Sequence, residues 1–258
     1  MRLPGPHRTA AVTLAVVAIT ATACDGDTPK TASTPTSSPP PSTAAGQLRV
    51  VEKGFTSTHI GRTAVVDYGV IFENSGPNVL TGANVRVSPV NSAGALQTTD
   101  GRPFNHGLTL LPGQRLGIGK RMLVKGTRPD VTDVRVDLSG ARWRRPEPGE
   151  GKLSVSGTKT TRFDDEDGSE GLRTTFTIES TYTQPVTFDV SQIVRSAKGK
   201  IVGGAFEQAR FETPPGAEVQ ATALPGRTTH KIKVSDDAMP PIGPGGTTEV
   251  YAWTNDQT

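Results

Sequence analysis

Cysteine is almost absent from this chain, with one residue, Cys24, in 258. A single cysteine cannot form an internal disulfide, so the folded part must be stabilised by its apolar core. Histidine is also scarce, and His59, His106 and His230 are too scattered to form the paired motifs that bind zinc. The chain also lacks a Walker loop, a dinucleotide-binding fingerprint and a Gly-x-Ser-x-Gly nucleophile motif. We therefore expect no cofactor and a function that is not enzymatic.

Long apolar runs are missing apart from one, which covers residues 10–23 and follows the basic residues Arg2 and Arg8. This run is too short to cross a bilayer as a helix, which takes about 20 apolar residues. A basic head, a short apolar stretch and small residues before a cut are typical of a secretory signal peptide. We predict that residues 1–23 are such a signal peptide.

The lone cysteine stands directly after this run, in Ala21-Thr22-Ala23-Cys24. The pattern resembles the lipobox of bacterial lipoproteins, although Ala21 stands where that family usually carries leucine. The resemblance implies that Cys24 becomes the mature N-terminus, and that the two chains of its diacylglyceryl group anchor the protein to the outer face of the cell membrane. Simple secretion, with a cut after the small-x-small pattern, is the alternative. Removal of residues 1–23 lowers the net charge from +3 to +1.

Residues 24–46 consist mainly of Thr, Ser, Pro and Ala, with little apolar mass. Such a segment cannot bury enough surface to offset the entropy lost on ordering, and its prolines favour extended geometry. We predict a disordered tether that separates the folded part from the membrane.

The rest of the chain shows the alternation of apolar and polar residues that is typical of β-strands, and no helical period. Val66, Tyr68, Val70 and Phe72 form one such set, and Leu172, Thr174, Phe176 and Ile178 another. Glycine and proline turns separate the predicted strands. We expect an all-β fold with two β-sandwich domains, at residues 47–140 and 153–258, joined by a linker at residues 141–152.

Several features recur between the two halves. Ser92-Ala93-Gly94 is matched by Ser196-Ala197-Lys198-Gly199, Leu111-Pro112-Gly113 by Leu224-Pro225-Gly226, and Trp143 by Trp253. The offsets are similar, at 105, 113 and 110 residues. A duplicated domain explains this, and two unrelated sandwiches with common turn sequences are the alternative.

The order of strands and of these turns resembles the immunoglobulin-like domains of bacterial extracytoplasmic lipoproteins, including the FxLYD type. The Phe-x-Leu-Tyr-Asp motif itself is absent, and residues 85–89 read Val-Arg-Val-Ser-Pro at that place. The low ratio of lysine to arginine, with abundant Ala, Gly, Pro and Thr, is similar to that of actinobacterial proteins. The resemblance implies a non-catalytic extracytoplasmic module with tandem immunoglobulin-like domains.

An acidic cluster at Asp164, Asp165, Glu166 and Asp167 offers the oxygen ligands that Ca²⁺ prefers. Its spacing does not fit an EF-hand, so Asp164, Asp165 and Asp167 are candidates for an irregular calcium site only. A solvated acidic turn between two strands is the alternative.

The segment Arg142-Trp143-Arg144-Arg145 is a candidate binding site for an anion, through charge and aromatic stacking. Alternatively, Trp143 packs against its own domain and the arginines are solvated. Three arginines and one tryptophan do not make an extended basic face, so nucleic acid is not expected as a partner.

Charge is unevenly distributed, with a net charge of +4 on residues 47–140 and of −4 on residues 153–258. The basic half could rest on anionic lipid or wall polymer, or it could dock on the acidic half. Our interpretation is a lipid-anchored module that binds an envelope protein or wall polymer. A lipoprotein that captures a ligand for a transporter, a structural spacer and an envelope enzyme with paired carboxylates are the alternatives.

Overall fold

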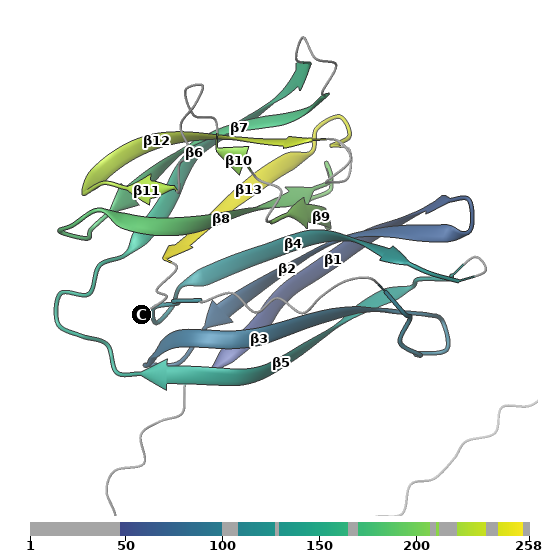
Figure 1. The fold of residues 1–258 in the computed structure, drawn as a ribbon, viewed down its shortest axis with the longest axis horizontal. Coiled ribbons are helices and arrows are strands. Elements are labelled where there is room, and N and C mark those ends of the chain that lie inside the picture. Colours follow the sequence, from purple (N-terminus) through teal and green to yellow (C-terminus); the bar gives the residue numbers. More distant parts are fainter. Residues whose placement is uncertain are drawn as a thin grey trace, which may run out of the picture. The chain divides into compact units, whose positions relative to one another are not determined.

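A computed structural model describes residues 47–99, 108–126, 129–164, 170–206, 210–211, 221–235 and 242–254 (Figure 1). The predicted signal peptide and tether lie outside these ranges. Every regular element of the described part is a strand, which confirms the all-β class. The strands are β1 (Leu48–Ile60), β2 (Thr63–Asn74), β3 (Val79–Val90), β4 (Arg115–Val124), β5 (Asp133–Arg144), β6 (Leu153–Asp164), β7 (Glu170–Ser180), β8 (Val186–Arg195), β9 (Ile201–Ala205), β10 (Arg210–Phe211), β11 (Thr222–Ala223), β12 (Gly226–Ser235) and β13 (Thr247–Thr254).

The first half is a sandwich in which the antiparallel sheet β1-β2-β4 packs against the pair β3-β5. Alternate residues of β2 point between these layers, as the sequence pattern predicts. Val66, Tyr68, Val70 and Phe72 are all buried in this core. The register is continuous from β2 to β4, with Val70 opposite Ile118.

The second half pairs β6, β7, β12 and β10 in one sheet, and places β8 between β13 on one side and β9 and β11 on the other. Its main core contains Phe176, Ile178 and Phe188, and a smaller cluster forms around Leu172 and Val194. Among the described strands, the order β6-β7-β12 facing β8-β13 repeats the order β1-β2-β4 facing β3-β5.

The turns repeat along with the strands. Gly94 and Gly199 follow β3 and β8, and both adopt a left-handed conformation, with φ of 77° and 76°. A side chain at either position would be strained, which explains why both turns carry glycine. The repeated pairing order is the arrangement that a duplicated domain predicts. Immunoglobulin-like ancestry stays a prediction.

The two halves pack against each other, and residues 43–258 form one compact unit. The face of sheet β1-β2-β4 that does not meet β3-β5 packs against β8, β9 and β13. A row of glycines makes this close approach possible: Gly54, Gly69 and Gly119 lie opposite one another on three neighbouring strands. A methyl group on Gly119 would lie 2.3 Å from the Cα atom of Gly204, so backbone touches backbone there.

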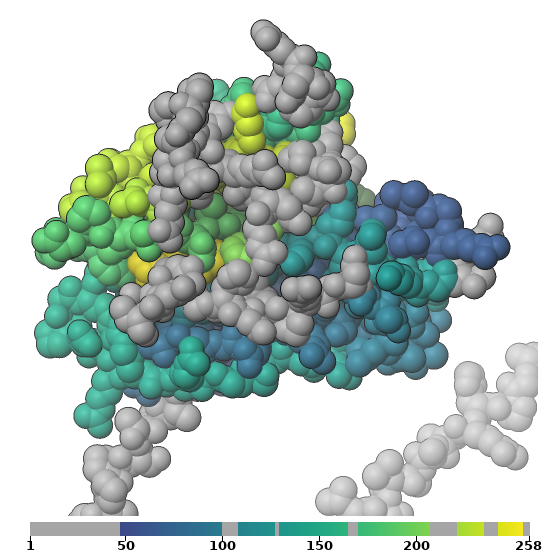
Figure 2. Space-filling view, in the orientation of Figure 1, coloured from purple at the N-terminus to yellow at the C-terminus, as the bar shows by residue number. Residues whose placement is uncertain are grey.

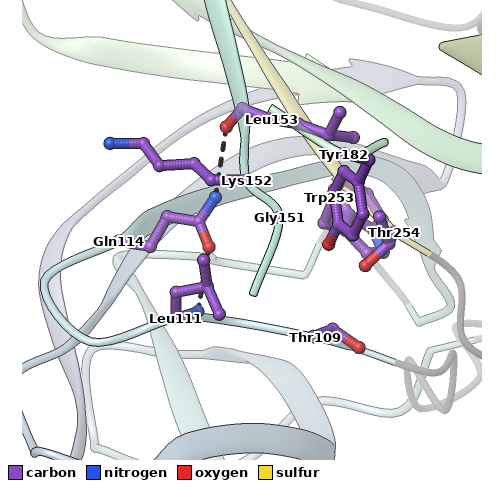
Figure 3. A pocket seen from close by; sticks show the side chains of 9 residues that line it. All are labelled: Thr109, Leu111, Gln114, Gly151, Lys152, Leu153, Tyr182, Trp253 and Thr254. Atoms are coloured by element: carbon purple, nitrogen blue, oxygen red, sulfur yellow. Dashed lines mark hydrogen bonds between the residues drawn. The ribbon is translucent and has the colours of Figure 1, made fainter. Parts of the chain in front are cut away.

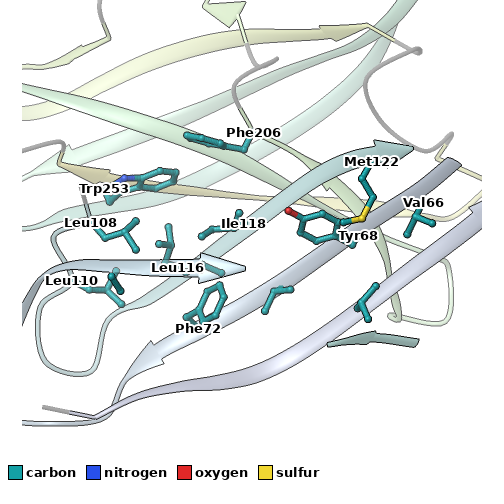
Figure 4. Close-up of a cluster of buried hydrophobic side chains, with 14 of the residues drawn as sticks. Val66, Tyr68, Phe72, Leu108, Leu110, Leu116, Ile118, Met122, Phe206 and Trp253 are labelled. Carbon is teal, nitrogen blue, oxygen red and sulfur yellow. The ribbon is translucent and has the colours of Figure 1, made fainter. Parts of the chain in front are cut away.

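Apolar side chains close the contact around the glycines. Ile71 of the first half packs with Ile193 and Ile201 of the second half in a cluster of their own. Phe206 and Trp253, with ring centroids 5.4 Å apart, complete the core of the first half from the other side (Figure 4). The two predicted sandwiches therefore share a core, and the basic half does pack on the acidic half.

Candidate functional site

A cluster of charged residues lies at this contact between the halves. Arg195 of β8 donates to both carboxylate oxygens of Glu52 on β1, at 2.6 and 2.8 Å, and to Glu249 of β13 at 2.6 Å. The hydroxyl of Tyr251 donates to Glu249 at 2.8 Å. The ion pair that links the halves thus takes its cation from the acidic half, which the net charges did not predict.

The pKa values follow from these contacts. The hydrogen bond to Glu52 raises the pKa of Arg195, and the same bond holds the pKa of Glu52 below its ordinary value. Burial, followed by the hydrogen bond to Glu249, raises the pKa of Tyr251. Perturbed groups often mark active sites, but here two carboxylates share one guanidinium, Glu249 from the neighbouring strand of the same sheet and Glu52 from the first half, as in a structural joint.

A second ion pair, in which the carboxylate is buried, lies on the same face of the first half. Asp67 of β2, which is 3% exposed, accepts hydrogen bonds from Arg121 of β4 at 2.7 and 3.0 Å. The two residues are directly opposite in the register, so the bidentate pair holds β2 and β4 together.

A hollow lies where the halves meet near Trp253, between Thr109 and Gln114 of the first half and Leu153 and Tyr182 of the second (Figure 3). The side-chain amide of Gln114 donates to the carbonyl of Leu153 across it, at 3.3 Å. The hollow holds about 10 Å³, which is room for one water molecule at most. It cannot hold a transported ligand.

A larger groove lies between β6 and the start of β13, with a volume of about 380 Å³. Hydroxyl groups line it, and Leu172 and Ile242 add apolar surface. Its lining is Thr158, Thr160, Thr161, Arg162, Leu172, Ile242, Gly246, Thr247 and Thr248. A volume of this size is within the range of small-ligand and side-chain pockets.

A chain of hydroxyls leads from the groove into the core of the second half. The hydroxyl of Thr160 bonds to those of Thr248 and Thr174, and Thr174 also accepts a hydrogen bond from the amide of Gln192. Thr174 and Gln192 are fully buried, so these bonds satisfy polar groups that water does not reach. The chain fixes the position of β6 relative to β13.

In the first half, the corresponding gap lies between β1 and β5, and a long side chain spans it. There, Lys53 of the edge strand β1 spans to the first residues of β5, donating to Asp133 at 2.9 Å and to the carbonyl of Val134. This hydrogen bond from Lys53 lowers the pKa of Asp133. In the second half, the hydroxyls of Thr160 on β6 and Thr248 on β13 make the direct contact between these two strands.

Another hollow, of about 450 Å³, lies at the hairpin between β1 and β2, beside His59, Gly61, Pro129 and Asp130. His59 contacts the carbonyl of Pro129 at 3.1 Å, and the neighbouring Ile60 is 71% exposed. The hairpin, in dark blue, projects from the described part of the molecule (Figure 2). This tip is a second exposed surface, without convergent polar groups.

The predicted arginine-rich site occupies the end of β5 and the start of the connection. Arg142, Trp143 and Arg144 belong to the strand, so strand structure continues into the segment expected as a linker. Trp143 packs on the first core, Arg142 lies over Gly82, and Arg144 pairs with Glu150, with one bond of 3.0 Å. Arg145 is exposed. The structure gives three of the four side chains a structural contact.

The other predicted sites lie largely outside the described residues. Asp164 is exposed at the end of β6, while Asp165 and Asp167 are outside the described ranges, as is Cys24. The described part of the chain contains no group of three or more potential metal ligands placed around one point. Within the same part, no helix has the length and apolarity to span a bilayer.

His230, one of the three scattered histidines, packs beside aromatic residues of the second half. It is half-buried on β12, with its ring 5.8 Å from that of Phe176 and 5.1 Å from that of Phe188. Burial lowers the pKa of His230, which favours the neutral ring. In the sequence, His230 alternates with Ile232 and Val234, and this pattern indicates a residue on the buried face of the strand.

The groove was not predicted from the sequence. A run such as Thr158-Lys159-Thr160-Thr161 has the appearance of a solvated edge strand, and only the register shows that Thr160 faces the buried Thr174. No family model matches this chain, and neither the curated proteins nor the solved structures contain a match.

Proposed function

We propose that this protein is a lipid-anchored extracytoplasmic module that acts by binding, not by catalysis. The observation that carries this proposal is the open groove between β6 and β13, beside a joint in which the perturbed charges are already paired. The described residues that line this groove are mainly threonines, with two apolar side chains, and such a lining is suited to recognition. The partner that we propose is a protein or a polymer of the cell envelope.

The location rests on the predicted signal peptide and on Cys24. Two acyl chains on this residue would give stable anchoring, since each buried methylene contributes about 0.8 kcal/mol. The proposed tether, residues 24–46, would then leave the compact unit accessible to partners near the membrane.

Membrane fractionation of cells that express the full chain, or its Cys24→Ala variant, tests the location. We expect the wild type in the membrane fraction, with a diacylglyceryl mass on Cys24 in intact-mass analysis, and the variant unprocessed or released. A soluble wild type, cut at the same region without lipid, would contradict the anchor.

A further inference from the structure

The sheet β6-β7-β12 has an outer face, formed by the alternate residues that do not point into the core of the second half. Phe176, Ile178 and Ile232 are buried in that core, so the residues that alternate with them point to the other face. The strands that meet the first half are β8, β9 and β13, and β6, β7 and β12 form the layer beyond them (Figure 1). The outer face therefore takes no part in the contact between the halves.

Two exposed lysines lie in one row across this face. Lys159 of β6, Thr175 of β7 and Lys231 of β12 are directly opposite one another in the register. Both lysines are exposed, and across two strand spacings their Cα atoms are about 10 Å apart. Two ammonium groups thus flank one threonine, and their side chains are long enough to meet at an anion between them.

The next row adds two more basic residues. Arg173 and Lys233 are opposite each other, about 7 Å along the strands from the first row. The guanidinium carbon of Arg173 is 5.6 Å, and the ammonium nitrogen of Lys233 is 5.0 Å, from the ring centroid of Phe163. Because this ring is neutral, the contact leaves the positive charge of both residues on the face.

This cationic face belongs to the half of the molecule with a net charge of −4. In the two rows nearer the start of β6, the described strands carry serines, threonines and one carboxylate, that of Glu179. Glu179 pairs with Arg227, with nitrogen and oxygen 3.6 Å apart. The charges of the second half are therefore separated in space, and a surface with one sign of charge attracts the opposite sign from solution.

We infer that the cationic face binds a linear polyanion in which phosphodiester groups alternate with short polyols. Ammonium groups such as those of Lys159 and Lys231 are donors to phosphate oxygens. The hydroxyls of Thr175 and Thr177 can donate to and accept from polyol hydroxyls. Cations spread over two rows suit the repeated charges of a polymer better than one compact anion. This inference names a partner for the proposed binding function and rests on it.

Apolar side chains distinguish this face from a surface that binds a lipid bilayer. The exposed large apolar residues of the described part are Val50, Val51, Ile60, Leu96, Leu123 and Leu224, and none of them belongs to β6, β7 or β12. Surfaces that bind a bilayer combine basic residues with apolar side chains that enter it. The composition of the face therefore favours a polymer over a lipid surface.

The aromatic residue of the face argues against a nucleic acid. Proteins that bind single strands stack the bases on aromatic side chains. Phe163 is 8% exposed and already contacts Arg173 and Lys233, so its ring is covered. The face thus provides charge and hydroxyl groups, which match a polyol phosphate, without a platform for bases.

Paired variants in the full chain carrying Cys24→Ala test the face. The variant Lys159→Gln/Lys231→Gln removes two positive charges from it, and Lys159→Arg/Lys231→Arg retains them. Lys198→Gln/Lys200→Gln is the matched control, because it removes two exposed lysines at the turn between β8 and β9 and changes the net charge equally. Circular dichroism and thermal unfolding would show that each variant is folded.

The probe is a synthetic glycerol phosphate oligomer, with binding measured by titration calorimetry. We expect a Kd at least about tenfold higher for the glutamine variant of the face than for the control, and a Kd within about threefold of wild type for the arginine variant. Affinity should fall steeply with salt. The slope of log K against log salt concentration should be smaller for the glutamine variant, because fewer counterions are released.

Several results would overturn the inference. The first is that the wild type does not bind the oligomer. The second is equal binding by the glutamine variant and the control, which would place the polymer elsewhere on the protein and leave the proposed binding function intact. The third is that phosphatidylglycerol vesicles or single-stranded DNA bind through these lysines while the oligomer does not. None of them affects the membrane test of Cys24, so failure of this inference is distinguishable from failure of the anchor.

Discussion

At the scale of single residues, the contact between the halves depends on the absence of side chains at a few positions. Gly119 and Gly204 bring two backbones together, and a methyl group at Gly119 would lie 2.3 Å from a Cα atom and 2.6 Å from a carbonyl carbon. Backbone atoms of two packed strands cannot move aside as a flexible side chain can. The added atom would therefore push the sheets apart.

We predict that Gly119→Ala lowers the free energy of unfolding by about 1–3 kcal/mol, as overpacking of a core does. Urea unfolding measures this directly. Gly243→Ala is the control, because nothing lies within 4 Å of a methyl group there, and its expected effect is within about 1 kcal/mol of zero. Equal effects of both substitutions would contradict the close approach.

Arg195 is the second residue on which the contact depends, because it holds carboxylates from both halves. We expect Arg195→Met to cost about 1–3 kcal/mol at neutral pH, since Glu52 and Glu249 lose their charged partner. Arg227→Met is the control. This substitution removes an exposed ion pair with Glu179, in which the nitrogen and oxygen atoms are 3.6 Å apart. Its loss should change the free energy of unfolding by less than about 0.5 kcal/mol.

The dependence of the unfolding free energy on pH below 7 provides an independent check on the ion pair of Arg195. The pKa of Glu52 is lowered in the folded state, so its contribution is present above the unfolded pKa and is lost as the pH falls through the folded pKa. The difference between wild type and Arg195→Met should therefore shrink in acid. A difference that stays constant from pH 7 to pH 3 would show that the ion pair is not its source.

At the scale of elements, β12 contains a half-buried histidine, His230. The pKa of His230 is lowered by burial between two phenylalanines. Because the folded pKa lies below the ordinary value of 6.5, the unfolded chain binds more protons in this interval. Stability therefore falls as the pH drops from about 6.5 toward the folded pKa.

We predict that the urea midpoint of the wild type decreases between pH 7.5 and pH 5.5, and that His230→Leu decreases less over the same interval. Both proteins retain the paired carboxylates, whose contributions are lost at lower pH. A decrease of the same size in both proteins would mean that His230 does not titrate differently on folding.

The elements also show what the sequence could predict. Strands such as β2 and β7 were predictable, because apolar residues that alternate between two turns indicate a strand with one buried face. The second face of β2 was not predicted to be buried, although Gly69 and Ile71 lie on it. Glycine inside a strand indicates a close approach of backbones, but the pattern does not say which strand approaches.

The candidate site was harder to predict than the strands. Thr158 and Thr160 differ little from solvated residues in the sequence, and the groove arises only because β13 returns beside β6 after more than 80 residues. Cys24, in contrast, was identified from sequence alone, because a cysteine directly after a short apolar run resembles a lipidation site. That identification stays a prediction.

At the scale of the whole molecule, residues 43–258 form one unit in which two sandwiches share a core. Trp253 belongs to the last strand, yet it packs with Phe206 on Leu108, Leu116 and other core residues of the first half (Figure 4). Unfolding of the second half would remove one wall of that core. The halves should therefore lose their structure together.

The most direct test uses the two tryptophans of the chain as separate reporters. Trp253→Phe leaves Trp143 to report on the first half, and Trp143→Phe leaves Trp253 to report on the closing strand. Circular dichroism of each variant gives its global transition. We predict that, in each variant, tryptophan fluorescence and circular dichroism follow one urea transition with the same midpoint. Fluorescence of Trp143 that stays native after part of the circular dichroism signal is lost would contradict the shared core.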